Sequence, residues 1–305
     1  MSLPRAFLDD VAILLGQFAK RGGLAPLSKA RSLVGKASRI AQVVPEATPF
    51  VGSLWAALVA AEAAAKSARP EAPPGRVAVR RFSAAAAWLL ALVSGAVLPL
   101  RRVVHEFPDE YRLPQAPEHI EFDASPWGGG GVLVRDGKPI QYWHCTWPDS
   151  LCRRFGAAVG LPKWQTLWEY IAALVCLLVW ADDFAVGQCL TLMGDNIGAL
   201  TGAAHFRGRR ELNAVTREIS WRKAAFQWSY VVAHLPSEAN DWADSLSRLA
   251  AVPPKPFPQA LRAAQAVPPP ALDVIWRTWV ADCPPPAPTL TQLPAGEGVL
   301  GAGFD

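Results

Sequence analysis

Four acidic residues occupy positions where a carboxylate has no simple structural role. Asp123 closes the strand-like segment HIEFDAS, Glu169 interrupts the apolar run TLWEYIAALVCLLVW, Asp195 ends LTLMGD, and Asp244 lies in NDWADSLSR. Carboxylate oxygens are the ligands that Mg²⁺ prefers in proteins. Two such ions about 3.5–4 Å apart can bind both the attacking water and the leaving oxygen of a phosphodiester. The four residues therefore predict a site for metal-assisted phosphodiester hydrolysis.

Each of these carboxylates has an alternative explanation that the residues alone leave open, and for Asp123 it is a turn or cap at the end of its strand. Glu169 is the only charge in its apolar run, so burial requires a partner, which is either a metal ion or a buried arginine. Asp195 could cap the helix that follows it, although Asn196 could supply the cap and leave Asp195 free.

The last carboxylate has a close competitor. Asp244 could form an exposed ion pair with Arg248, one helical turn away. Asp241 lies one turn before Asp244 on the same expected helix, and helix geometry alone does not choose between the two.

The elements that must position these residues lie between residues 118 and 249. IEFDAS, GGVLVRD and PIQYWHC read as three strands, with PWGGGG as the first connection and Asp136-Gly137 as a hairpin turn. A buried helix over 166–181, a strand, two helices and a fifth strand follow, and Ser237 caps a last helix that ends at Arg248. The order β-β-β-α-β-α-α-β-α predicts an α/β domain with a mixed five-stranded sheet flanked by helices.

Composition and patterning divide the rest of the chain. Residues 1–68 are expected to be a mainly helical segment, 69–117 a linker with an apolar helix, and 250–305 a proline-rich and mostly disordered tail. The uncharged run 83–100 only reaches the lower edge of the roughly 20 residues that span a bilayer, so we expect a buried or amphipathic helix and no membrane. The odd count of 5 cysteines, without metal-ligand spacing, favours a reduced intracellular protein, cytoplasmic or nuclear.

A basic face is expected on one helix of the first segment. Lys29, Arg31, Lys36 and Arg39 lie opposite its apolar positions, without nearby acids in the sequence. Such a face either contacts phosphates or is solvated.

The order of elements and the motifs FDAS, GGGGVL, GDNIGAL and HLPSEANDWADSLSRL resemble the ribonuclease H domain of retrotransposon-type reverse transcriptases. The resemblance covers residues 118–249, and ARSLVGKASRIAQVVPEATPF is similar, more loosely, to the thumb and connection segment of the same proteins. It implies a ribonuclease H-like sheet, an RNA·DNA hybrid as substrate, and two Mg²⁺ ions, with Mn²⁺ as a substitute. Asp123 and Asp244 would hold one ion, and Asp123, Glu169 and Asp195 the other.

The resemblance also implies roles outside the metal ligands. His234 would lie in a mobile loop and serve in proton transfer or product release, for which its near-neutral intrinsic pKa is suitable. The residues expected to contact nucleic acid are Asn196, Arg207, Arg209, Arg210 and Asn240. The alternative for the arginines is a solvated loop.

Polymerase activity is not expected from this chain alone. Asp182 and Asp183 follow the Glu169 helix instead of joining two strands, although a polymerase domain in a longer polyprotein is a conceivable partner. Two rival functions remain: a module that binds hybrid or duplex without cutting, and a transposase or integrase of the same fold that acts on DNA. The long aromatic loop 142–164 departs from the family pattern and puts substrate access in question.

Overall fold

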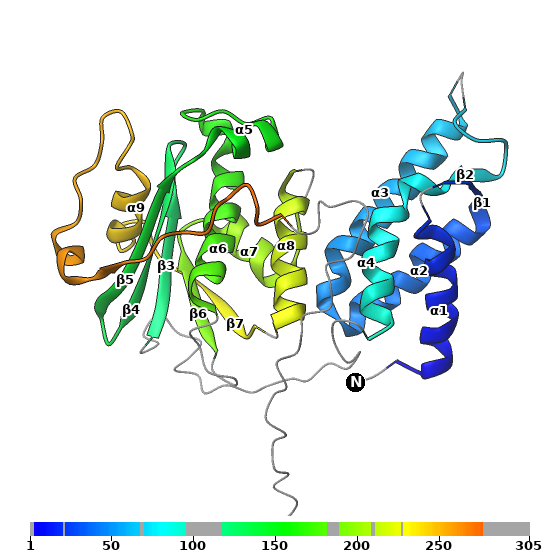
Figure 1. Cartoon of the computed structure of the whole chain (residues 1–305), viewed down its shortest axis with the longest axis horizontal. Helices are drawn as coiled ribbons and strands as arrows, with labels where there is room; N and C mark the ends of the chain where they lie inside the picture. The colour runs from blue at the N-terminus through cyan, green and yellow to red at the C-terminus, as the bar shows by residue number, and fades with distance from the viewer. Residues whose placement is uncertain are drawn as a thin grey trace, which may run out of the picture.

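The computed structural model describes residues 3–20, 22–67, 70–95, 118–181, 189–208, 211–226 and 228–276. Two large hydrophobic clusters and a small third one organise them. The first is built mainly from the helices before residue 95, which we call the helical unit, and the other two from residues 118–276, which we call the sheet unit. Figure 1 shows the two units side by side.

Proline residues set where the helices of the helical unit begin. Pro4 and Pro26 precede the first two helices, and Pro45 opens the short turn before the third. Proline fits these places because its missing N–H would have no partner in a first helical turn. The elements are α1 (Arg5–Phe18), β1 (Leu24–Pro26), α2 (Leu27–Val43), η1 (Pro45–Ala47), α3 (Thr48–Ala65), β2 (Arg76–Ala78), η2 (Val79–Arg81) and α4 (Ser83–Val93).

The apolar helix expected in the run 83–100 is buried over its described part. Trp88 and Leu89 of α4 are at most 2% exposed within the helical unit, and residues 96–117 lie outside the described residues. By length and composition alone, the segment Pro45–Ala65 is apolar enough to cross a membrane, and 44% of it is buried in the structure.

The basic face of α2 is satisfied by partners within the helical unit. Arg31 pairs with Glu62 at 2.9 Å, Lys36 contacts Asp10, Lys29 donates to Gln17, and Arg39 lies over the ring of Phe7. These contacts favour the interpretation that the basic face of α2 is solvated over the interpretation that it binds phosphates.

The sheet unit contains the five expected strands and a short sixth one. Its sheet has the order β7-β6-β3-β4-β5-β8, with β3, β4 and β5 antiparallel and β6 and β7 parallel to β3. The elements are β3 (Glu118–Ala124), β4 (Gly128–Arg135), β5 (Lys138–Thr146), α5 (Asp149–Phe155), η4 (Pro162–Trp164), α6 (Gln165–Trp180), β6 (Leu190–Gly194), α7 (Ile197–His205), α8 (Glu211–Phe226), β7 (Tyr230–His234), α9 (Asp241–Ser247), η6 (Gln259–Ala263) and β8 (Gln265–Ala266).

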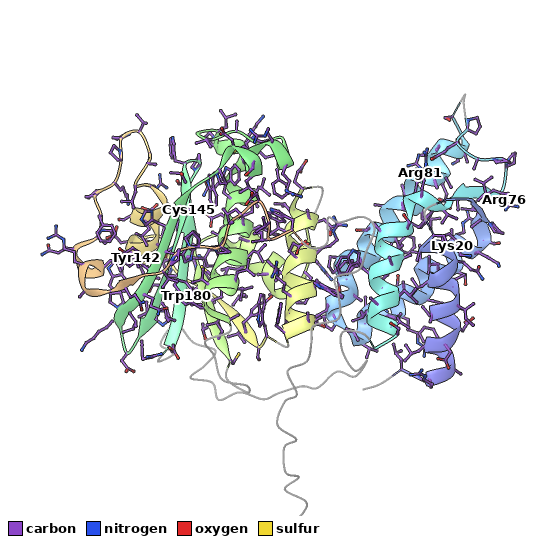
Figure 2. All side chains as sticks on the ribbon, in the orientation of Figure 1. Lys20, Arg76, Arg81, Tyr142, Cys145 and Trp180 are labelled. Carbon is purple, nitrogen blue, oxygen red and sulfur yellow. The ribbon has the colours of Figure 1, made fainter. Side chains whose placement is uncertain are left out.

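Helices cover both faces of this sheet. α9 lies on one face, and α6, α7 and α8 lie on the other (Figure 1). Trp180 Nε1 donates to Gln141 Oε1 at 2.8 Å, which ties the end of α6 to β5; Figure 2 shows Trp180 at the base of that helix. The arrangement is compatible with a ribonuclease H-like fold, with one more strand than expected.

Three details of the sheet unit differ from the sequence-based prediction. The connection PWGGGG was expected to lead into a strand that begins at Gly130, but β4 already begins at Gly128. The aromatic loop 142–164 contains the extra helix α5. Beyond residue 249, the expected disorder does not describe 250–276, because η6, β8 and the buried side chains of Leu272 and Trp276 pack on the sheet unit. Residues 277–305 lie outside the described residues.

Helix α8 joins the two units. Ala214 and Ile219 belong to the cluster of the sheet unit, whereas Trp221 belongs to that of the helical unit. Trp221 meets Trp88 edge-on with ring centroids 4.4 Å apart, and Asn213 Nδ2 donates to Ser53 Oγ at 3.1 Å. The helical unit therefore packs against the helix-covered face of the sheet unit that carries α8.

Candidate metal centre

Asp123 lies near the end of the central strand β3, and a glycine opposite it allows α9 to come close. Its register partner on β4 is Gly130. A Cβ atom on Gly130 would lie 2.4 Å from the Cβ of Leu246 in α9, so only glycine lets the helix pack directly on the strand here. This close approach brings α9 and its carboxylates to Asp123, which is 4% exposed.

Glu169 is brought to the same place by α6 and is held there by a neighbouring amide. Gln165 Nε2 donates to Glu169 Oε1 at 2.7 Å and also to the carbonyl oxygen of Ala124 at 2.5 Å. Glu169 is 2% exposed, and its Oε2 atom is buried without a hydrogen-bond partner among the described residues. A buried carboxylate oxygen without a partner is costly, so this atom fits a cation ligand.

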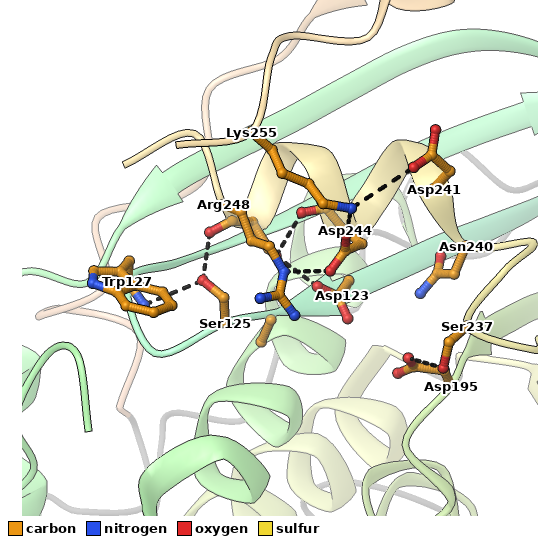
Figure 3. Close-up of polar contacts among 12 residues, drawn as sticks. Asp123, Ser125, Trp127, Asp195, Ser237, Asn240, Asp241, Asp244, Arg248 and Lys255 are labelled. Atoms are coloured by element: carbon orange, nitrogen blue, oxygen red, sulfur yellow. Dashed lines mark hydrogen bonds and ion pairs between the residues drawn. The ribbon is translucent and has the colours of Figure 1, made fainter. Parts of the chain in front are cut away.

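Asp195 is free of the capping role that was its alternative. The N-cap of α7 is Asn196, whose Oδ1 accepts a hydrogen bond from the backbone N–H of Ala199 at 3.0 Å. Asp195 Oδ2 instead accepts from Ser237 Oγ at 2.8 Å. Ser237 was expected to cap the last helix, but α9 begins only at Asp241, and this serine holds a carboxylate (Figure 3).

The carboxylates of Asp123, Glu169 and Asp195 converge. Each offers an oxygen, and the three oxygens lie within 4.8 Å of one another. Burial and the charges of Asp195 and Asp244 raise the pKa of Asp123 to about 7, although the hydrogen bond from Ser247 opposes this shift. Burial and the charge of Asp123 also raise the pKa of Glu169 well above its usual value. Because mutual repulsion of this kind is relieved by a divalent ion, the group fits Mg²⁺ or a similar hard cation.

Asp244 lies beside this group but is not one of the three converging residues. Arg248 Nε donates to Asp244 Oδ1 at 2.5 Å, and Lys255 Nζ contacts Asp244 Oδ2. Both oxygens of Asp244 are therefore engaged by cations. The ion pair with Arg248, which was the structural alternative for Asp244, is present; the charge of Asp244 also acts on Asp123.

Two serines connect the strand of Asp123 to α9, and the sequence analysis did not assign them a role. Ser247 Oγ donates to Asp123 Oδ2 at 2.6 Å. Ser125 Oγ donates to the backbone oxygen of Ser247 at 2.6 Å and accepts from the backbone N–H of Trp127 at 3.2 Å (Figure 3). The signal was available, because these are the serines of the FDAS and ADSLSR motifs.

The other predicted residues occupy different surroundings. His234 is exposed at the end of β7 and is in register with Gly194, the residue before Asp195. Asn240, which was expected to contact nucleic acid, is fully buried in this structure, and its Nδ2 donates to the backbone oxygen of Phe122 at 3.0 Å. It instead fixes the strand next to Asp123.

The arginines of the α7–α8 connection are only partly described. Arg207 is exposed and lines a cleft of about 360 Å³ between α3 and the sheet unit, together with Gly52, Tyr170 and Asn213. Arg209 and Arg210 lie outside the described residues.

No protein-family model matches the chain, and no curated protein does. A solved structure of RNase H1 from the halophilic archaeon Halobacterium salinarum NRC-1 is 25% identical to the chain, covering 45% of this chain and 98% of that one, with a TM-score of 0.32. A likeness of that size does not establish family membership. The sheet unit and its buried carboxylates are compatible with a metal-dependent nuclease of ribonuclease H-like fold.

Proposed function

We propose that this chain is a divalent-metal-dependent endonuclease that hydrolyses the RNA strand of RNA·DNA hybrids. The observation that carries the proposal is the convergence of Asp123, Glu169 and Asp195 from β3, α6 and the end of β6, with Glu169 Oε2 buried and unpartnered among the described residues. Two buried carboxylates and a third, partly buried one, all of like charge, serve no purpose in packing, whereas they are suited to hold a hard cation.

A bound Mg²⁺ would supply Lewis-acid polarisation of the phosphodiester and a water of lowered pKa. The chain's own residues orient and restrain the groups around it. Gln165 fixes the direction of Glu169, and Ser247 and Ser237 fix one oxygen each of Asp123 and Asp195. Hydrogen bonds of this kind hold metal ligands in place and tune their basicity.

His234 stands at the rim of the site, where proton transfer is feasible. It is exposed, and it is the residue of β7 in register with Gly194. An imidazole side chain can act as a proton donor or a proton acceptor. We assign it a proton-transfer or product-release role, and we assign Asn196 and Arg207 contacts with the nucleic acid backbone.

The motif set supports an origin in a retroelement reverse transcriptase. Ser125 of FDAS donates a hydrogen bond to the backbone oxygen of Ser247 in ADSLSR, and Ser247 donates one to Asp123 of FDAS. These two motifs therefore form one structural unit around Asp123. We further propose two ions of Mg²⁺, or Mn²⁺ in its place, with Asp244 as a ligand of one of them. The four described cysteines are free thiols, which supports an intracellular setting.

The test is a cleavage assay on labelled RNA·DNA hybrid, duplex DNA and single strands. We expect the RNA strand of the hybrid to be cut only with Mg²⁺ or Mn²⁺ present, and no cutting with excess chelator. Asp123→Asn serves as the matched control, since the amide keeps the shape but loses the charge. Cleavage of duplex DNA alone would mean that the site belongs to a DNA nuclease. Binding of the hybrid without cleavage in the presence of any of the tested metals would mean that the chain is a binding module.

A further inference from the structure

Lys255 reaches the candidate metal centre from the segment that follows α9. Its Nζ contacts Asp244 Oδ2 and lies 3.8 Å from Asp241 Oδ1. Figure 3 shows the side chain crossing α9 toward both aspartates. With Arg248 on the other oxygen of Asp244, the carboxylate is held between two cations.

The backbone around Lys255 is tied down, so this placement is a property of the fold. The N–H of Lys255 donates to the backbone oxygen of Arg248 at 3.1 Å, which closes the chain back onto the end of α9. Further on, Leu261 of η6 is fully buried with Leu246 of α9 against Val132 and Val134 of β4. The backbone hydrogen bond and the buried Leu261 therefore hold the segment in place, with Lys255 next to α9.

The charges around the centre balance for one divalent ion. The carboxylates of Asp123, Glu169, Asp195 and Asp244 face two cations, Arg248 and Lys255. Asp241 is left out of this count because its side chain is 74% exposed and solvent screens its charge. When all the carboxylates are ionised, the remaining charge equals that of a single divalent ion. A second divalent ion bound by Asp244 would lie close to the Lys255 ammonium, which already contacts Asp244 Oδ2. The two positive charges would repel each other strongly, because the site is partly buried.

We propose that Lys255 controls the binding of a second divalent ion, and we call it the counter-ion latch. Without substrate, the protein binds one divalent ion tightly, at Asp123, Glu169 and Asp195. A second ion binds to Asp244 only when the Lys255 side chain has moved away from this carboxylate. This inference rests on the proposed metal centre and names how its second ion is regulated. The latch is reversible because the Lys255 side chain is 42% exposed, and ion pairs of that exposure are weak. The phosphates of a bound nucleic acid supply the anionic partner that Lys255 moves to.

The test is calorimetric titration of the substrate-free full chain with Mn²⁺, followed by thermal unfolding at each metal concentration. We expect one tight ion for the parent, and a second ion that binds at least about tenfold more tightly in Lys255→Met than in the parent. Lys255→Arg keeps the charge and should behave as the parent. Lys138→Met removes one positive charge from the exposed hairpin at the opposite end of β4 from Gly130, so it controls for net charge.

The outcomes separate this inference from the proposed function. One tight ion in every variant, with an unchanged second ion in Lys255→Met, would overturn the latch and leave the metal centre standing. Two ions of equal affinity in the substrate-free parent would also overturn it. Failure of all proteins to bind any ion would remove the metal centre itself, and the latch with it. Lys255→Gln repeats the measurement if the methionine variant does not fold.

Discussion

Ser247 Oγ donates a hydrogen bond of 2.6 Å to Asp123 Oδ2, which joins α9 to a carboxylate on β3 that lies 124 residues earlier in the chain. Ser247 is 1% exposed. The bond stabilises the ionised form of Asp123 against the burial that disfavours it. The C-terminal motif therefore acts on the metal centre through a serine as well as through Asp244.

Ser247→Ala is expected to weaken metal binding by about 10–100-fold, because the pKa of Asp123 rises further when its hydrogen bond is lost. Calorimetric Mn²⁺ titration at two pH values measures this, and the deficit should shrink at the higher pH. Ser245→Ala on the same helix is the control, since the described structure shows no bond from that hydroxyl to the carboxylates of the site. Equal metal affinities in the two variants would remove Ser247 from the centre.

Asp123→Asn and Asp195→Asn should each abolish hybrid cleavage while making the metal-free protein more stable. The amide removes one charge from a group of carboxylates whose like charges raise the pKa values of Asp123 and Glu169. Relief of this repulsion should raise the metal-free Tm by roughly 2–4 °C. Scanning calorimetry in chelator, with and without added Mg²⁺, gives both readouts. A variant that loses stability in chelator would show that the hydrogen bond from Ser247 or Ser237 to its carboxylate outweighs the repulsion.

The metal-free protein should lose stability as the pH rises from about 4 to about 7. Because the folded-state pKa of Asp123 is raised to about 7 from 3.8, its contribution is fully present below pH 4 and is lost as the pH passes through the folded pKa. The loss should be on the order of 4 kcal/mol in the free energy of unfolding. Urea unfolding in chelator at several pH values measures it.

Two controls define this pH effect. Excess Mg²⁺ should cancel the loss, since metal binding replaces the protons as the pH rises. Asp123→Asn should flatten the profile. A chelated parent that becomes more stable between pH 4 and 7 would contradict the raised pKa of Asp123.

The sequence indicated the carboxylates and the strands. It did not indicate the tertiary contacts that decide between two interpretations of the same residues, such as a turn or a strand for the glycines of β4. The alternation and length of the apolar runs fix β3 and α6, so Asp123 and Glu169 could be placed on their elements from the sequence. A run of four glycines has the local signature of a turn. Only the approach of Leu246 and Trp143 to β4 explains why glycines occupy a strand there.

Lys255 shows a different limit of sequence reasoning. It lies in AVPPKPFPQ, whose proline content indicates an extended or disordered segment. Its position over Asp244 depends on the packing of Leu261 against β4, a contact with no local sequence signal. Ser237 was misplaced for a related reason, since a serine before a helix is equally suited to cap it or to bond a carboxylate beyond it.

Gln165→Leu is expected to lower metal affinity by about 10–100-fold with little effect on folding. The change removes the amide that bridges Glu169 Oε1 and the backbone oxygen of Ala124, and it leaves both oxygens of a buried carboxylate without a fixed orientation. Mn²⁺ titration followed by calorimetry checks this. Gln265→Leu removes an exposed amide pair with Gln141 on the sheet edge and is the matched control. An unchanged affinity in Gln165→Leu would mean that Glu169 is held by other contacts.

The two aspartates of α9 should differ sharply, although both lie in its first turn. The Asp241 side chain is 74% exposed and its nearest recorded cation is Lys255 at 3.8 Å, whereas the Asp244 side chain is 19% exposed and acts electrostatically on Asp123. Asp244→Asn should therefore lower the rate of hybrid cleavage by orders of magnitude, with partial recovery in Mn²⁺. Asp241→Asn should change the rate by no more than a few-fold and cost about 0.3–1 kcal/mol of stability through the lost charge at the helix N-terminus. Single-turnover cleavage measures the rate of each variant, and urea unfolding measures its stability. An inactive Asp241→Asn together with an active Asp244→Asn would show that Asp241, and not Asp244, is the catalytic carboxylate of α9.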